Sequence, residues 1–134
     1  MATFAVAETN KMQHIIKERI KELRAWAKEN IAGKEVYHNE LGSTVHFTNN
    51  GIKEYLNQPH KYYFEKNQMI KDIQRIIESS EYKGSTIHKN RISHIFEIEI
   101  NKDKSWIIAN ENDEKKIQFY SISDNEKVLT GVKK

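Results

Sequence analysis

The sequence predicts an α+β domain in which N-terminal helices pack on one face of a four-stranded antiparallel sheet. Up to Ser80, apolar residues recur every three or four positions, as they do along one face of a helix. After Ser80 they alternate with polar residues, as in strands with one buried face. Short polar connections join the alternating segments, which suits antiparallel hairpins. Helices followed by strands are typical of the α+β class.

A long helix is expected near the start of the chain, from about residue 10 to residue 31. Gly33 follows it where a C-terminal cap belongs. Two short extended segments are expected next, at Glu35–His38 and Thr44–Phe47. The apolar stripe of the helix consists of Ile16, Ile20, Leu23 and Ala27.

Pro59 separates two further helices. The first is capped by Thr48 or its neighbour and stops near Gln58, because a proline disfavours the helical conformation of the residue before it. The second is expected from about His60 to Ser79. Its buried face is formed by Tyr63, Lys66, Ile70, Ile73 and Ile77.

Four strands are expected after Ser80, at residues 82–87, 94–100, 105–109 and 117–123. In the second strand, alternation places His94 and Phe96 toward the helices and Glu97 on the opposite face, which is expected to stay uncovered. The length of 134 residues fits a single domain. It comprises a helical part (1–33), a middle part of short strands and helices (34–80) and the antiparallel sheet (81–128).

Charge and hydropathy narrow the possible function classes. Lys and Arg number 22 against 19 Asp and Glu, and the resulting net charge of +3 does not by itself indicate a nucleic-acid-binding protein. Basic and aromatic residues concentrate between Lys53 and Lys104, which suits either a one-sided basic groove or ordinary solvated faces. We expect no association with membranes, because no apolar stretch approaches the ~20 residues of a spanning helix.

Metal-dependent and cofactor-dependent chemistry are not expected. The chain has no cysteine, and its six histidines never fall at the i, i+4 spacing of a helical metal pair. It also has no Gly-rich loop that could hold the phosphates of a nucleotide. The class of chemistry that remains open is acid–base chemistry by histidine, lysine, serine and tyrosine side chains.

The densest group of candidate catalytic residues surrounds Pro59. His60 is expected at the start of a helix, where the positive helix end lowers its pKa toward the neutral form. A neutral imidazole can act as a general base, and Lys53 or Lys61 could bind a phosphate. The alternative is that His60 only caps the helix and that both lysines are solvated.

Three further groups offer the same choice between chemistry and structure. His94 is either a second acid–base residue or a histidine at the edge of the core. The hydroxyls of Tyr120, Ser121 and Ser123 either bind a phosphate or satisfy the sheet edge. The basic segment from His88 to Arg91, which includes Lys89, either steers a polyanion or is a solvated loop.

Several short motifs resemble a known family. The segments Thr48–Glu54 and Asn57–Lys61, followed in order by Tyr82–Gly84, Ser93–Glu97 and Tyr120–Asp124, resemble a domain found at the C-terminus of phage Mu-like (MuF-type) head morphogenesis proteins and in large polyvalent proteins of mobile elements. The resemblance covers roughly residues 25–128. The matching region is similar to the barnase–EndoU–colicin–RelE-like (BECR) nuclease superfamily, in the version carried by phages and polymorphic toxins.

The resemblance implies a metal-independent endoribonuclease toxin. Such enzymes use the ribose 2′-OH to attack the adjacent phosphate and leave a 2′,3′-cyclic phosphate and a 5′-OH, with tRNA among the candidate substrates. The implied roles are acid–base catalysis for His60 and His94, electrostatic stabilisation for Lys53 and phosphate orientation for Ser121. The implied RNA-binding residues are Lys61, Tyr62, Lys66, His88, Lys89, Arg91 and Ser123.

The resemblance also implies a biological setting. The toxin would reach the cytoplasm of a target bacterial cell as part of a larger toxin or phage protein, and an acidic immunity protein would cover its basic groove. Two alternatives stay open. The first is a non-catalytic module that binds nucleic acid or phage-head protein, and the second is a toxin that acts on a nucleotide cofactor.

Overall fold

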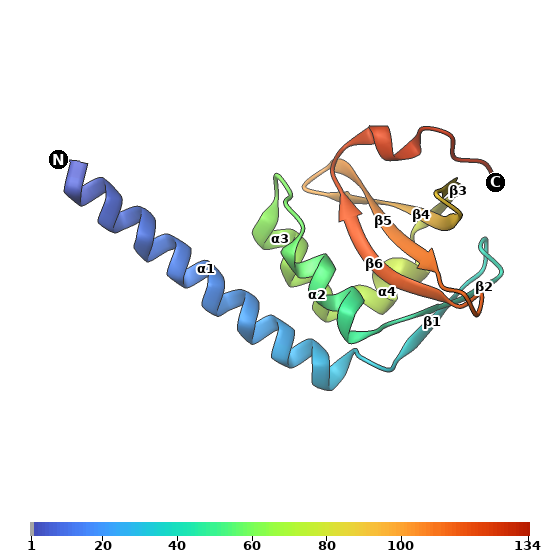
Figure 1. The fold of residues 1–134 in the computed structure, drawn as a ribbon, viewed down its shortest axis with the longest axis horizontal. Helices are drawn as coiled ribbons and strands as arrows, with labels where there is room; N and C mark the ends of the chain where they lie inside the picture. The colour runs from blue at the N-terminus through green and yellow to red at the C-terminus, as the bar shows by residue number, and fades with distance from the viewer. Residues whose placement is uncertain (1) are drawn as a thin grey trace.

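The computed structural model describes the backbone of residues 2–134 and the side chains of residues 11–134. It is an α+β domain built on one six-stranded sheet (Figure 1). The helical segments are α1 (Ala2–Asn30), α2 (Asn49–Asn57), α3 (Tyr63–Gln68), η1 (Met69–Asp72), α4 (Ile73–Glu78) and η2 (Glu126–Leu129). The strands are β1 (Glu35–His38), β2 (Ser43–His46), β3 (Glu81–His88), β4 (Arg91–Ile100), β5 (Asp103–Glu111) and β6 (Ile117–Ser123).

The prediction of a four-stranded antiparallel sheet is wrong, because the sheet has six strands and is mixed. Its order is β1-β2-β6-β5-β4-β3, and β2 pairs with β6 in parallel through Val45 with Ile117 and His46 with Gln118. The β1–β2 hairpin is too short to bury Val36 and Val45 by itself, so it gains stability by joining the edge of β6. Local alternation does not report such a pairing, which joins residues about 70 positions apart in the chain.

The helix expected from His60 to Ser79 is interrupted. It begins at Tyr63 rather than His60 and is divided by the 3₁₀ turn η1 into α3 and α4. Asp72, at the end of η1, has φ −121° and ψ 17°, which is outside the helical region. Ile70, Ile73 and Ile77 all reach the core despite the interruption, as the spacing predicted.

Two tight turns shape the antiparallel part of the sheet. Lys89 and Asn90 join β3 to β4, and Asn101 and Lys102 join β4 to β5. All four have positive φ, between 51° and 70°, as type I′ turns require. The basic segment 88–91 is therefore the tip of a hairpin, which carries its charges at one end of the sheet.

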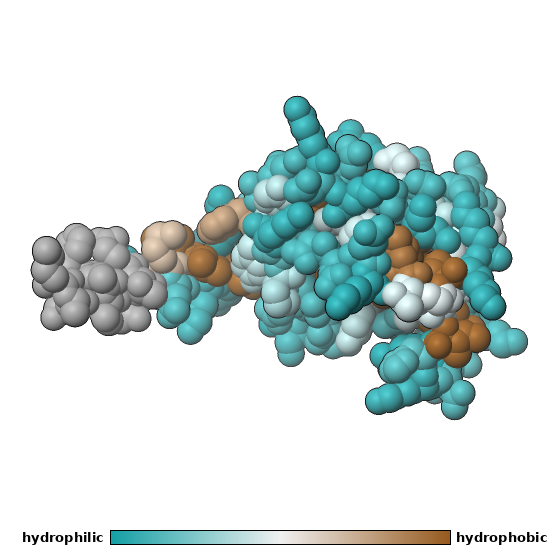
Figure 2. Space-filling view, turned by 90° about the horizontal axis from the view of Figure 1, so that it is seen from above, coloured by the Kyte–Doolittle hydropathy of each residue, from teal (hydrophilic) through white to brown (hydrophobic). Residues whose placement is uncertain are grey.

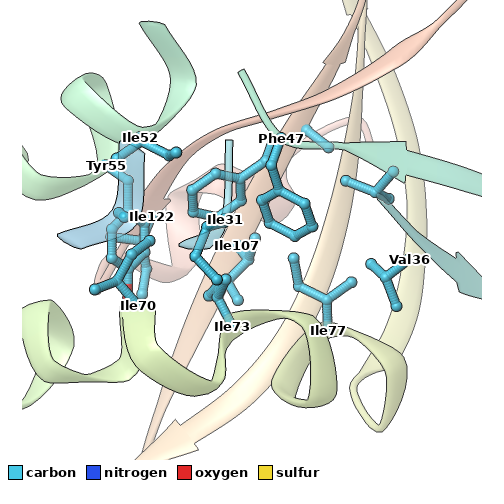
Figure 3. Packing of buried hydrophobic residues seen from close by; sticks show 14 of the residues in the cluster. Ile31, Val36, Phe47, Ile52, Tyr55, Ile70, Ile73, Ile77, Ile107 and Ile122 are labelled. Carbon is cyan, nitrogen blue, oxygen red and sulfur yellow. The ribbon is translucent and has the colours of Figure 1, made fainter. Parts of the chain in front are cut away.

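The main core lies between the helices and one face of the sheet. Figure 3 shows Ile52 and Tyr55 of α2 and Ile73 and Ile77 of α4 gathered over Ile107 and its neighbours. The opposite face is not left bare as the alternation predicted, since Ile95 and Trp106 are also buried there. The C-terminal segment η2 packs against β5, and Lys133 pairs with Ser85 of the edge strand β3.

Helix α1 belongs to the core only in its C-terminal half. Leu23 and Ala27 are buried, whereas Met12 and Ile15 are about half exposed. Figure 1 shows the N-terminal half of α1 extending away from the sheet, and Figure 2 shows hydrophobic residues along this projecting part. No helix in the described residues is long and apolar enough to cross a membrane.

Gly51 sets the distance between α2 and β6. A Cβ atom at this position would lie 1.9 Å from the carbonyl oxygen of Phe119, and backbone atoms of a strand cannot move away cheaply. Thr48 caps the same helix end by accepting a hydrogen bond from the Gly51 N–H. The start of α2 is thereby held against the middle of β6.

We predict that Gly51→Ala lowers the free energy of unfolding by about 2 kcal/mol, because the overpacking outweighs the gain in helix propensity. Urea unfolding measures this change. Lys53→Ala on the exposed side of α2 is the matched control and should stay within about 0.5 kcal/mol of the parent protein. A Gly51→Ala protein at least as stable as the parent would contradict the close approach.

Candidate functional site

His60, the central residue of the predicted catalytic group, is held in a fixed tautomer by its neighbours. Its Nδ1 accepts a hydrogen bond from the Tyr62 N–H at 2.9 Å, so Nε2 carries the proton and donates to Ser105 Oγ at 2.9 Å. The ring is buried, and this burial lowers the pKa of His60. Both nitrogens are therefore engaged inside the protein, and His60 is placed as a structural residue.

The lysines and tyrosine around His60 also face other protein groups. The Lys61 ammonium lies 3.2 Å from Asp103, and the Tyr62 hydroxyl donates to the same carboxylate. The Lys61 N–H donates to Asp124 at 2.8 Å. These contacts hold the segment after Pro59 against the β4–β5 turn and the residue after β6, and they reduce what Lys61 could offer a phosphate.

Lys66, predicted to bind RNA, is completely buried. Its ammonium donates hydrogen bonds to the carbonyls of Tyr55, Leu56 and Gln58 at 2.8–3.2 Å, at the end of α2 where carbonyls lack the N–H donors of a following helical turn. Burial lowers the pKa of Lys66 to about 7. The side chain caps α2 from α3 and has no path to a ligand.

The remaining predicted residues do not converge on His60. Lys53 is exposed on α2, and Ser121 is buried in β6, paired with Ile108. Ser123 accepts a hydrogen bond from the Asn125 N–H in a turn. Along β5, Ser105 beside His60 is four residues from Ala109, which pairs with His94, so the two histidines are separated by roughly 13 Å. They cannot form one acid–base pair.

His94 lies in a different setting, in a chain of side-chain hydrogen bonds that we call the His94 cluster (Tyr82, His94 and Glu111). Its Nε2 lies 2.8 Å from Glu111 Oε1, and its Nδ1 lies 2.8 Å from the Tyr82 hydroxyl. Burial raises the pKa of Tyr82, so its phenol keeps the proton that it donates to Nδ1. His94 then carries its proton on Nε2 and donates it to the Glu111 carboxylate.

A β-bulge brings Tyr82 into this cluster. Tyr82 pairs with Phe96, but the next pair is Gly84 with Ile95, so Lys83 is an extra residue. Gly84 has a φ of 125°, a value that side chains other than glycine rarely adopt.

Beside the His94 cluster is a pocket of about 130 Å³, which we call the corner pocket. It lies where the start of β4, the end of β5, the middle of β6 and the first turn of α2 meet. The residues that line it include Arg91, Asn110, Glu111, Asn112, Gln118 and Tyr120. This volume leaves room for a group larger than one water molecule.

Two lining residues of the corner pocket carry the chemistry. Glu111, whose side chain is 23% exposed, belongs to both the pocket and the His94 cluster. Arg91 is exposed at the hairpin tip beside His88 and Lys89. Among the side chains of residues 11–134, no carboxylate lies within ion-pair distance of Arg91.

A second bulge places Tyr120 at the same pocket. Ile108 pairs with Ser121 and Ala109 with Phe119, so Tyr120 has no partner residue on β5. Glu111 is a functional candidate that the sequence patterns missed, whereas Tyr120 belongs to the segment Tyr120–Asp124, whose hydroxyls were expected either to bind a phosphate or to satisfy the sheet edge. The pairing of His94 with Ala109, which the Asn101–Lys102 turn sets, would have placed Glu111 on the face of His94.

No group of three or more His, Asp or Glu side chains in the described part of the chain is arranged to hold a metal ion. The corner pocket offers a carboxylate (Glu111), a guanidinium (Arg91) and a phenol (Tyr120), and the imidazole of His94 contacts the carboxylate.

Comparison with known proteins places the chain in a class of domains associated with large polyvalent proteins. The model of the family described as large polyvalent protein-associated domain 3 (LPD3) matches residues 15–120, and the chain belongs to this family. No curated protein and no solved structure matches the chain. The predicted association with large polyvalent proteins is confirmed, while the relationship to BECR nucleases stays a prediction.

We predict that Lys66→Met lowers the free energy of unfolding by about 2 kcal/mol, because three carbonyls at the end of α2 lose their buried donor. Chemical denaturation measures the change, with Lys53→Met on the exposed side of α2 as control. If the two variants have equal stability, the Lys66 ammonium does not hold the helix end.

Proposed function

We propose that this domain is a metal-independent endoribonuclease that cleaves RNA by attack of the ribose 2′-OH on the adjacent phosphate. The observation that carries the proposal is the meeting of Glu111, Arg91 and Tyr120 at the corner pocket, with Glu111 held by His94. Transesterification needs a base, an acid and a cation for the charge on the phosphorane, and these three side chains supply one of each.

The proposed roles follow from the contacts of each side chain. One Glu111 oxygen accepts the His94 Nε2–H, and the other takes the proton of the 2′-OH as its oxygen bonds to phosphorus. The bond from phosphorus to the 5′ oxygen breaks, and the Tyr120 phenol protonates that oxygen. Arg91 offsets the negative charge of the phosphorane. His94 is a positioning residue, because it acts through Glu111.

The setting around the pocket supports a polyanionic substrate. His88, Lys89 and Arg91 project at the exposed tip of the β3–β4 hairpin, next to the pocket that Arg91 helps to line. The cations Lys89 and Arg91 at such a tip attract a phosphate backbone over several ångströms. Membership in LPD3 and the motif resemblance to phage and toxin nucleases support the same substrate class.

The wider setting is part of the proposal. The domain acts as a toxin in the cytoplasm of a target bacterium, with RNA, including tRNA, as its substrate. An acidic immunity protein blocks it by covering the hairpin tip and the corner pocket, since its negative charge complements theirs. The second candidate is an RNA-binding module without catalysis, which the exposed cations of the hairpin tip would also serve.

We predict that Glu111→Gln lowers the rate of RNA cleavage at least 100-fold, because the amide keeps the shape of the side chain but cannot take a proton. Gel analysis of RNA incubated with protein in EDTA measures the rate. Lys17→Ala, exposed on α1 and outside the site, should cleave within a few-fold of the parent rate. Full activity of Glu111→Gln would overturn the assigned base, and salt-sensitive binding without cleavage by the parent protein would establish the second candidate.

A further inference from the structure

The corner pocket is lined by several primary amides, and in two of them the side-chain oxygen accepts hydrogen bonds from other protein groups. Asn112 Oδ1 accepts hydrogen bonds from the backbone N–H groups of Glu114 and Lys116, at 3.0 and 2.9 Å. Backbone N–H groups only donate, so the amide oxygen and not its NH₂ must face them. Both lone pairs of this oxygen are used, and the NH₂ is what Asn112 has left to offer.

Asn110 is oriented in the same sense by a neighbouring strand. Ser93 on β4 pairs with Asn110 on β5, and its hydroxyl donates to Asn110 Oδ1 at 2.7 Å. The Asn110 NH₂ is the remaining donor of that side chain. Together with the Arg91 guanidinium, which has no acceptor, three lining residues of the pocket offer hydrogen-bond donors.

This arrangement restricts the ligand. An asparagine that reads adenine uses its oxygen and its NH₂ together, and the Asn112 oxygen is saturated. A group that only accepts hydrogen bonds satisfies all three donors, and its negative charge suits Arg91. The negative charge of Glu111 opposes the binding of an anion at the pocket. The hydrogen bond that His94 donates to this carboxylate offsets part of that effect.

We infer that Arg91, Asn110 and Asn112 form a binding subsite for a backbone phosphate of a polynucleotide. The inference rests on the proposed function, in that it places the phosphate next to Glu111. The same donors would accept the phosphate of a small free metabolite. The exposed cations of the β3–β4 hairpin, which extend beyond the pocket, favour a chain of phosphates as the source.

The test uses the full chain and two probes that cannot be cleaved, inorganic phosphate and a single-stranded DNA oligonucleotide. The side-chain NH₂ signals of Asn110 and Asn112 are followed by NMR during each titration. Asn112→Asp keeps the oxygen that accepts from Glu114 and Lys116, but replaces the donor by a negatively charged acceptor. Asn101→Asp adds the same charge in the turn at the far end of the sheet, where the residue has φ 52°, and is the matched control.

Both probes are expected to shift the NH₂ signals of Asn110 and Asn112. Asn112→Asp should weaken oligonucleotide binding at least tenfold, while Asn101→Asp changes it less than twofold. Equal weakening by both variants, or unshifted NH₂ signals, would overturn the subsite. Signals that move with phosphate but not with the oligonucleotide would overturn the polynucleotide as the ligand. Because neither probe is cleaved, RNA that stays intact would count against the proposed ribonuclease while leaving this binding result in place.

Discussion

Strand β6 joins the two halves of the domain, and the rest of the structure depends on its two edges. On one edge it pairs with β5 and so belongs to the antiparallel meander. On the other it pairs in parallel with β2 and then lies against the start of α2, where the absence of a side chain at Gly51 allows close approach to Phe119. The helices are thereby held at a fixed position over the meander, and the first turn of α2 forms one wall of the corner pocket.

Two groups of hydrogen-bonded polar side chains lie at opposite ends of the β4–β5 hairpin. Near the β4–β5 turn, His60, Lys61 and Lys66 form hydrogen bonds with other groups of the protein. These bonds hold α2, α3 and the neighbouring strand ends relative to each other. At the other end, Tyr82, His94 and Glu111 form a chain of hydrogen bonds next to a pocket, with Arg91 exposed beside it. Glu111 is hydrogen-bonded to His94 and is also partly open to solvent at the pocket.

Local patterns in the sequence predicted the α2 segment, the separate strands and the turn chemistry well, because these features depend on neighbouring residues. They did not predict the parallel pairing of β2 with β6 or the break at η1, which depend on packing between distant segments. The same limit applies to the site. His94 and Arg91 were identified from their residue types, but the sequence favoured His60, whose engagement by Tyr62 and Ser105 only the folded chain reveals. Glu111 was missed because strand register brings it to the pocket, and the sequence did not show that a bulge places Tyr120 beside it.

In the proposed mechanism, a carboxylate, a phenol and a guanidinium at the corner pocket act together on a phosphodiester without a metal ion. The most direct measurement is the chemical identity of the RNA ends after incubation with the purified domain in EDTA, determined by mass spectrometry of the fragments. The proposed mechanism predicts fragments that end in a 2′,3′-cyclic phosphate and begin with a 5′-OH. Intact RNA, or fragments with a 3′-OH and a 5′-phosphate, would contradict it.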